Sequence, residues 1–290
     1  MEERLSLLSV HAHPDDESSK GAGTIAKYAA QGVHTVLVCC TGGEAGDILN
    51  PAMDTPEVRE RLHEVRMEEL RKATEIIGYS EVVMLGYRDS GMPETPENEH
   101  PDCFANADFD EAVGRLVAII RRTRPHVIIT YPEDQQGYLH PDHLRVHDIS
   151  VPAFHAAGDP DRFPGTGEPW TPSKLYYSAW SRRRMVATHE KMLELGMESP
   201  YKEDWFKNRP DCDHLITTSI DLGDHADVRR HALLAHATQI DPNSPFWFGL
   251  PPEVARTVHP YDEYILAESR VETEPPEDDL FAGVRDLVNR

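Results

Sequence analysis

Two clusters of histidine and carboxylate side chains each follow an apolar stretch of the sequence. The first cluster, residues 11–17 (HAHPDDE), comes directly after the apolar run 5–10. The second cluster, residues 138–143 (YLHPDH), follows the apolar run 127–131. Pro14 cannot extend a sheet and favours the first turn of a helix, so the first cluster is expected on a turn between a strand and a helix. Both clusters are therefore expected at the ends of strands, where α/β proteins place their ligand sites.

The residue types in these clusters are those of a metal hydrolase. His13 and Asp16 are three positions apart, so their side chains can face one point, while Asp15 approaches it from another side. Catalytic zinc usually binds three protein ligands and keeps one open position, and His143 would complete that set. Asp15 and His140 would then stay free for proton transfer or charge stabilisation. Each cluster alone is also compatible with an ordinary turn or helix cap, and only the pair favours a metal site.

The first half of the chain alternates between apolar strands and amphipathic helices. Strands are predicted at 5–10, 33–40, 82–85 and 127–131. Helices are predicted at 21–30, 56–77 and 110–122. This alternation predicts an α/β fold with a Rossmann-like, mostly parallel sheet flanked by helices, and a site in the crevice at its carboxyl edge. The first strand leads into histidines and aspartates instead of a glycine-rich loop, so a dinucleotide cofactor is not favoured.

The sequence is less regular from residue 159 onward. Strands at 175–179 and 216–220 and helices at 183–195 and 225–236 are predicted there. Because no clean linker or repeat is present, we expect residues 1–158 to form an α/β metal-hydrolase core and residues 159–290 a smaller carboxyl-terminal subdomain, within one continuous globular unit. The subdomain would cover the active-site pocket and complete it.

The composition excludes several classes of partner. The 290-residue chain holds 29 Lys and Arg residues against 51 Asp and Glu residues, a formal net charge of −22. Such an acidic surface repels phosphate backbones and anionic lipids, so neither nucleic acid nor a membrane is an expected partner. No apolar run is long enough to span a membrane and the first residues do not resemble a signal peptide, so a cytoplasmic protein is expected. The four cysteines show no zinc-ribbon spacing, and no structural disulfide is expected.

The two histidine motifs resemble those of the zinc-dependent N-acetylglucosaminyl deacetylases of the PIG-L/LmbE-like family. The resemblance implies one Zn²⁺ ion per chain, held by His13, Asp16 and His143, although iron(II) would fit similar nitrogen and oxygen ligands. It also implies that Asp15 is the general base, which takes a proton from the attacking water and passes it to the leaving amine.

The same resemblance implies further catalytic and substrate-binding roles. His140, oriented by Asp142, would stabilise or protonate the tetrahedral intermediate, and Tyr138 would polarise the amide carbonyl. Substrate contacts are expected from four further residues: Arg66 and Asp89 on sugar and inositol hydroxyls, Lys20 on the cysteinyl side, and Ser90 in the loop after the third strand. Solvated helix surface is the alternative for Lys20 and Arg66, but substrate binding is favoured because sugar hydroxyls need convergent charged donors and acceptors.

Later segments resemble the amidase branch of the family, which acts on mycothiol S-conjugates. They include residues 41–44 (TGGE), 48–54 (ILNPAMD), 173–177 (SKLYY) and 235–243 (AHATQIDPN). The implied substrate is a small thiol–sugar conjugate, cleaved at its glucosaminyl amide to a mercapturic acid and glucosaminyl-inositol in thiol-dependent detoxification. The alternatives are the deacetylase of N-acetylglucosaminyl-inositol in mycothiol biosynthesis, a paralogue that trims a mycothiol adduct in natural-product biosynthesis, and a non-catalytic sugar- or thiol-binding protein. Whether the chain forms a homo-oligomer is left open.

Overall fold

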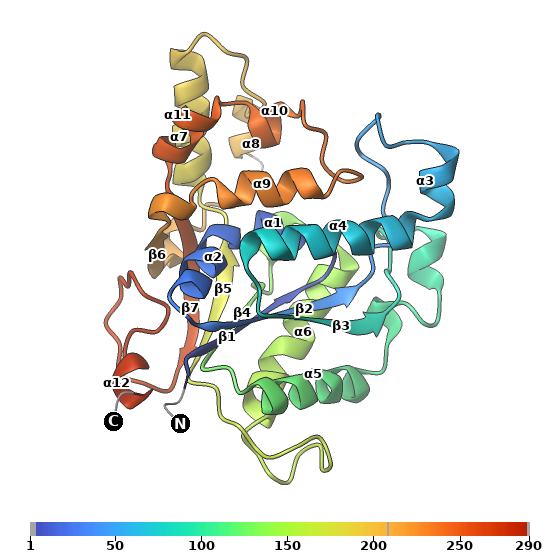
Figure 1. Ribbon diagram of the computed structural model, residues 1–290, viewed down its shortest axis with the longest axis vertical. Helices are drawn as coiled ribbons and strands as arrows, with labels where there is room; N and C mark the ends of the chain where they lie inside the picture. The colour runs from blue at the N-terminus through green and yellow to red at the C-terminus, as the bar shows by residue number, and fades with distance from the viewer. Residues whose placement is uncertain (1–3, 208, 289–290) are drawn as a thin grey trace.

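The computed structural model describes residues 4–207 and 209–288 and contains a seven-stranded sheet (Figure 1). The strand order across the sheet is β3-β2-β1-β4-β5-β7-β6. The strands are β1 (Ser6–His11), β2 (His34–Thr41), β3 (Glu81–Tyr87), β4 (Val127–Thr130), β5 (Lys174–Ala179), β6 (Thr218–Asp221) and β7 (Tyr261–Ser269). The first five are parallel to one another, whereas β7 is antiparallel to both β5 and β6. The predicted mostly parallel α/β sheet is confirmed.

Helices cover both faces of this sheet (Figure 1). They are α1 (Asp16–Ser19), α2 (Ala22–Ala30), α3 (Pro56–Glu60), α4 (Leu62–Ile77), α5 (Phe109–Thr123), α6 (Pro141–Ala156), α7 (Arg182–Glu194), α8 (Glu203–Lys207), α9 (Val228–Ala235), α10 (Pro245–Phe248), α11 (Pro252–Val258) and α12 (Arg285–Val288). On one face α4 packs beside α9, and on the other α5 packs beside α6. No helix among the described residues is long and apolar enough to cross a membrane.

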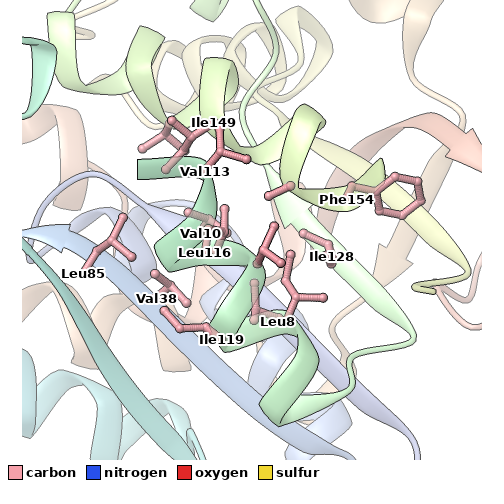
Figure 2. Packing of buried hydrophobic residues seen from close by; sticks show 14 of the residues in the cluster. Leu8, Val10, Val38, Leu85, Val113, Leu116, Ile119, Ile128, Ile149 and Phe154 are labelled. Carbon is pink, nitrogen blue, oxygen red and sulfur yellow. The ribbon is translucent and has the colours of Figure 1, made fainter. Parts of the chain in front are cut away.

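The alternation of side chains along β1 divides the core into two layers. Leu8 and Val10 point to the layer beneath α5 and α6, which Figure 2 shows from close by, whereas Leu7 points to the opposite layer. This is the two-residue period of a strand that is buried on both faces. The second layer also contains Tyr264 and Phe281, so the carboxyl-terminal part of the chain shares a core with the first strand.

The helix predicted over 56–77 is interrupted. Arg61 leaves the helical conformation (φ −121°, ψ 25°), which separates α3 from α4. The second part buries Leu70, Ala73 and Ile77 against the sheet, but α3 has no buried residue. Because α3 buries no side chain, packing does not hold it in line with α4. The prediction of one continuous helix is therefore wrong at Arg61.

Strand β7 was not predicted. Its buried positions include Asp262 and Glu263, which do not fit the apolar pattern of a strand. The Asp262 carboxylate accepts hydrogen bonds from the backbone N–H and the hydroxyl of Thr24, both at 3.0 Å, and Glu263 pairs with Arg183. Residues 159–290 thus contribute β5, β6 and β7 to the single sheet. The division into 1–158 and 159–290 stays a prediction.

Candidate metal and catalytic site

Parallel pairing brings the two histidine clusters together. Strands β1 and β4 are neighbours, with Leu7 beside Val127 and Ser9 beside Ile129, so their carboxyl ends meet at one edge of the sheet. His13 lies on the turn after β1, and Asp16 begins α1. The second cluster opens α6, where Pro141 is the first helical residue. This is the juxtaposition that the sequence predicted.

The three predicted metal ligands are buried and face one another. The Oδ2 atom of Asp16 lies 3.5 Å from Nδ1 of His13 and 3.3 Å from Nε2 of His143. Each residue offers one ligand atom, and these three atoms lie within 4.8 Å of one another. A second such group is formed by His13, Asp89 and His140. Both groups contain His13, whose Nδ1 faces Asp16 of the first group and whose Nε2 faces Asp89 of the second.

The electrostatics of this place fit a bound cation. Burial lowers the pKa of His143 to about 3 against the influence of Asp16, which leaves a neutral imidazole with a lone pair for a metal. Burial alone would raise the pKa of Asp16, but His143 and Lys20 outweigh it and hold that pKa well below its usual range. Two neutral or neutralisable imidazoles and one carboxylate are a donor set that zinc accepts.

His13 is surrounded by carboxylates. Its Nε2 lies 3.1 Å from Asp142 and 3.6 Å from Asp89, while Nδ1 faces Asp16. Burial acts to lower the pKa of His13, but hydrogen bonds to these three carboxylates outweigh it and raise that pKa well above its ordinary value. The surroundings of His13 therefore favour a positive charge, whether a proton or a metal ion.

Asp142 was predicted to orient His140, but its carboxylate contacts His13 and Ser90. Its carboxylate accepts hydrogen bonds from His13, from the backbone N–H of Ser90 at 3.0 Å and from the Ser90 hydroxyl. Only the backbone N–H of Asp142 reaches His140, donating to Nδ1 at 3.2 Å. Asp142 therefore orients His140 through the main chain, and its carboxylate orients His13.

Ser90 is the predicted substrate contact that the structure places elsewhere. It is fully buried, and its hydroxyl both donates to Asp142 and accepts from the backbone N–H of Ala105 at 2.9 Å. It is not among the residues that line the cavity. As a correction, Ser90, three residues after β3, supports Asp142 instead of facing a substrate, because its buried hydroxyl is used in the bonds to Asp142 and Ala105.

Asp15 has the backbone and the surroundings of a functional residue. Its φ of 118° is rare for any residue except glycine, and its backbone N–H donates to Glu17 at 2.9 Å. Burial raises the pKa of Asp15 to about 6, and Arg66, whose Nη2 lies 3.5 Å away, opposes that rise. A carboxylate with such a pKa is largely ionised near neutral pH but holds a proton readily.

Arg66 is buried beneath a glycine loop. It donates to the carbonyl oxygens of Gly43 and Pro14, each at 2.6 Å. At Gly43 (φ +67°) a Cβ atom would lie only 2.3 Å from Cζ of Arg66, so the loop needs glycine there. The arginine also lines the cavity. Its main-chain bonds fix the turn that carries Asp15, in addition to any contact with a substrate.

A cavity of about 510 Å³ opens over the metal donors. Every predicted site residue except Ser90 and Asp142 lines it, including Lys20, whose ammonium pairs with Asp16 and lies 5.2 Å from the ring centre of Tyr131. Tyr138 stands at the rim with 47% of its surface exposed. The cavity is large enough for a sugar-sized ligand.

Two features of the site were missed from the sequence. A buried pair joins Glu17 to Nε2 of His236 at 2.7 Å, and both side chains are fully inaccessible. Trp180, Phe246 and Trp247 also line the cavity. The motif AHATQ around His236 and the run PFWFG at 245–249 carried the signal, but nothing in the sequence linked these distant segments to the metal donors.

Known proteins are similar to this chain. The family model described as GlcNAc-PI de-N-acetylase (PIG-L) matches residues 8–154, which contain both histidine clusters. The chain belongs to this family. A PIG-L relative, the mycothiol S-conjugate amidase of Streptomyces coelicolor, is 48% identical over 295 residues, which cover 99% of both chains.

Other PIG-L relatives are deacetylases. The 1D-myo-inositol 2-acetamido-2-deoxy-alpha-D-glucopyranoside deacetylase of Geodermatophilus obscurus is 40% identical over 96% of this chain and 97% of its own. The solved N,N'-diacetylchitobiose deacetylase from Pyrococcus horikoshii superposes with a TM-score of 0.61 at 17% identity, over 90% of this chain and 83% of the other. That structural likeness concerns the fold alone.

Proposed function

We propose that this chain is a zinc-dependent amide hydrolase that cleaves the glucosaminyl amide of mycothiol S-conjugates. The observation that carries the proposal is the 48% identity to a mycothiol S-conjugate amidase across 99% of both chains. It is supported by a complete set of metal donors beside a half-buried carboxylate in a cavity of about 510 Å³. The products would be a mercapturic acid and glucosaminyl-inositol.

The donor set supports zinc as the proposed metal. His13, Asp16 and His143 would hold one zinc ion, because their three ligand atoms converge and all three side chains are buried. When bound, zinc lowers the pKa of a water molecule and polarises the amide carbonyl. Asp142 and Ser90 would keep the His13 ring in place through the bond at 3.1 Å.

Asp15 is the proposed general base and acid. During hydrolysis the water oxygen bonds to the carbonyl carbon, the C–N bond breaks, and one water proton moves to the leaving amine. Asp15 would accept that proton and deliver it, since its pKa of about 6 lies near neutral pH. Arg66 and the Asp15 backbone bond to Glu17 would hold the carboxylate toward the cavity.

His140 is the proposed stabiliser of the tetrahedral intermediate. Burial and then His13 lower its pKa, so the ring is neutral. Its Nδ1 accepts the backbone N–H of Asp142, which places the ring proton on Nε2. Nε2 is then a hydrogen-bond donor for the developing oxyanion, a role that Tyr138 at the cavity rim would share.

The test is a comparison of two amides. Purified protein loaded with zinc is assayed on a mycothiol bimane conjugate, following both the released amine and the bimane mercapturate, and on N-acetylglucosaminyl-inositol, following acetate. We expect a higher kcat/KM on the conjugate and loss of both activities in His143→Ala. Much faster release of acetate would refute the amidase assignment and favour the deacetylase, which the relatives at 40% identity support.

The proposal places the enzyme in the cytoplasm with a small-molecule substrate. Cys39, Cys40 and Cys103 are buried as free thiols and Cys212 is a partly buried one, which fits a reducing compartment. Neither nucleic acid nor a membrane enters the proposed reaction.

A further inference from the structure

The cavity over the metal donors is lined by two chemically different sets of side chains. Asp15, Arg66 and Asp89 are charged, whereas Trp180, Phe246, Trp247 and Leu233 are apolar or aromatic. Sugar hydroxyls require hydrogen-bonding partners, so the charged set suits the glucosaminyl-inositol half of the proposed substrate. The aromatic set is left for the other half, beyond the scissile amide.

Three rings of the aromatic set pack on one another and form an aromatic wall. The rings of Trp180 and Phe246 lie 5.9 Å apart and nearly parallel, at 11°. The ring of Trp247 stands edge-on to both, at 5.8 Å from Trp180 and 4.8 Å from Phe246. Tyr201 supports Phe246 from α8's side at 5.8 Å. Such a wall offers flat apolar surface at a low entropy cost, since aromatic side chains have few rotatable bonds.

A second cavity of about 140 Å³ adjoins the first at Trp180, Leu233, Phe246 and Trp247, which line both. It is formed where α7, α9, α10 and α11 gather above α1 and α2 in Figure 1. Its lining includes four arginines (Arg184, Arg229, Arg230 and Arg256) and one carboxylate, Asp227, which lies 3.6 Å from Arg256. A concentration of positive charge is unusual in a chain whose net charge is −22.

Two of these arginines have unused capacity for a negative partner. Arg229 and Arg230 stand over rings, 5.3 Å from the centre of Trp180 and 4.6 Å from that of Phe248. Within residues 4–207 and 209–288 neither forms an ion pair with a carboxylate. Nε of Arg229 is also buried without a hydrogen-bond partner in that part of the chain. Guanidinium groups over aromatic faces bind planar groups and anionic groups well.

We propose that the aromatic wall and the arginine-lined cavity adjoining it form the subsite for the S-linked group of the conjugate. The inference rests on the proposed function, because it assumes that the amide carbonyl sits over the metal donors. The subsite selects planar aromatic S-substituents, and among them those that carry a negative charge. Arg229 connects it to the metal site, since its guanidinium bonds the carbonyl oxygen of Ser19, directly before Lys20.

The test compares three mycothiol conjugates that differ only in the S-linked group: methyl, benzyl and 4-carboxybenzyl. In the wild-type enzyme we expect kcat/KM to rise in that order. Trp247→Ala should lower the benzyl-to-methyl ratio of kcat/KM about tenfold, through lost apolar contact and ring pairing. Arg230→Gln should lower the carboxybenzyl-to-benzyl ratio, also about tenfold, because a charge-assisted hydrogen bond is lost.

Two variants serve as matched controls. Phe163→Ala removes a partly buried ring that packs on Gly114, far from the wall along the chain, and Arg71→Gln removes an exposed guanidinium on α4. Neither should change the ratios. Binding of S-benzyl-N-acetylcysteine, followed by tryptophan fluorescence, gives a second readout that needs no turnover, and Phe246→Leu replaces Trp247→Ala if the latter does not fold.

The outcomes separate the two proposals. Cleavage of all three conjugates with ratios that stay the same in Trp247→Ala and Arg230→Gln would overturn the subsite and leave the amidase assignment standing. Cleavage of N-acetylglucosaminyl-inositol alone would overturn both. A loss of selectivity in the wall and arginine variants, with weaker binding of the benzyl mercapturate to Trp247→Ala, would support the subsite.

Discussion

Glu277 anchors the carboxyl-terminal tail by pairing with a lysine that is completely buried. The Lys174 ammonium lies 2.5 Å from Glu277, with 0% and 2% of the two side chains exposed. Tyr176 and Thr218 donate to the same carboxylate at 2.5 and 3.1 Å. In Glu277→Ala the ammonium would remain inside the protein without its counter-charge. Breaking a buried pair in this way costs about 3–5 kcal/mol.

This cost should be visible as a fall in melting temperature. For a chain of this size about 1 kcal/mol corresponds to about 2–4 °C, so Glu277→Ala should lower Tm by about 6–20 °C. Lys174→Met combined with Glu277→Leu removes both charges and should recover most of that loss, because apolar residues of similar volume replace buried ion pairs well. Thermal and urea unfolding, followed by circular dichroism and tryptophan fluorescence, measure both variants.

The stability that Glu277 contributes should decrease in acid. Burial alone would raise the pKa of Glu277, but Lys174, Thr273 and Tyr176 outweigh it and lower that pKa in the folded state. A lowered folded-state pKa gives a contribution that is complete above the ordinary carboxyl pKa of about 4.3 and is lost as the pH falls through the folded-state value. The difference between wild type and Glu277→Ala should therefore shrink in acid.

Two results would refute this reasoning. If Glu277→Ala lowered the free energy of unfolding by less than about 1 kcal/mol, the pair would contribute no more than an exposed ion pair does. A double variant as unstable as the single one would mean that the unpaired lysine is not the cause. The same unfolding curves test whether residues 1–158 and 159–290 form one unit, since we expect a single transition from the core that Leu7 shares with Tyr264.

Three further predictions concern the active site. Asp15→Asn should lower kcat about 10²–10⁴-fold with unchanged zinc content, the loss expected of a general base, and full turnover would refute the assignment. His236→Ala removes the partner 2.7 Å from Glu17 and should lower kcat with little change in KM, because the backbone bond from Asp15 to Glu17 is loosened. His236→Gln keeps a hydrogen-bond donor and should recover part of the lost kcat. Equal kcat values in the two variants would contradict a positioning role for His236. Removal of metal by a chelator should lower Tm, and added zinc should restore it, as for any ligand that binds only the folded state; an unchanged Tm would contradict the donor set.

The metal donors could be predicted from the sequence because their chemistry is local. His13 and Asp16 are three residues apart, and the proline between them fixes a strand-to-helix turn whatever surrounds it. His143 stands in a motif of the same kind after an apolar strand. The parallel sheet then follows from the alternation of strands and helices, and neighbouring parallel strands end at the same edge.

Other features depended on contacts between distant segments. The sequence gives no sign that Asp142 faces His13, that Ser90 is buried behind it, or that His236 pairs with Glu17 across 219 positions. Strand β7 was missed because its buried carboxylates are acceptable only when Thr24 and Arg183 supply their partners. The sequence by itself determined which residues can bind a metal and where their strands end, since proline turns and apolar runs act over a few residues. The tertiary structure alone decided which polar groups are paired and which aromatic rings close the cavity, because burial and hydrogen bonding are properties of the packed chain.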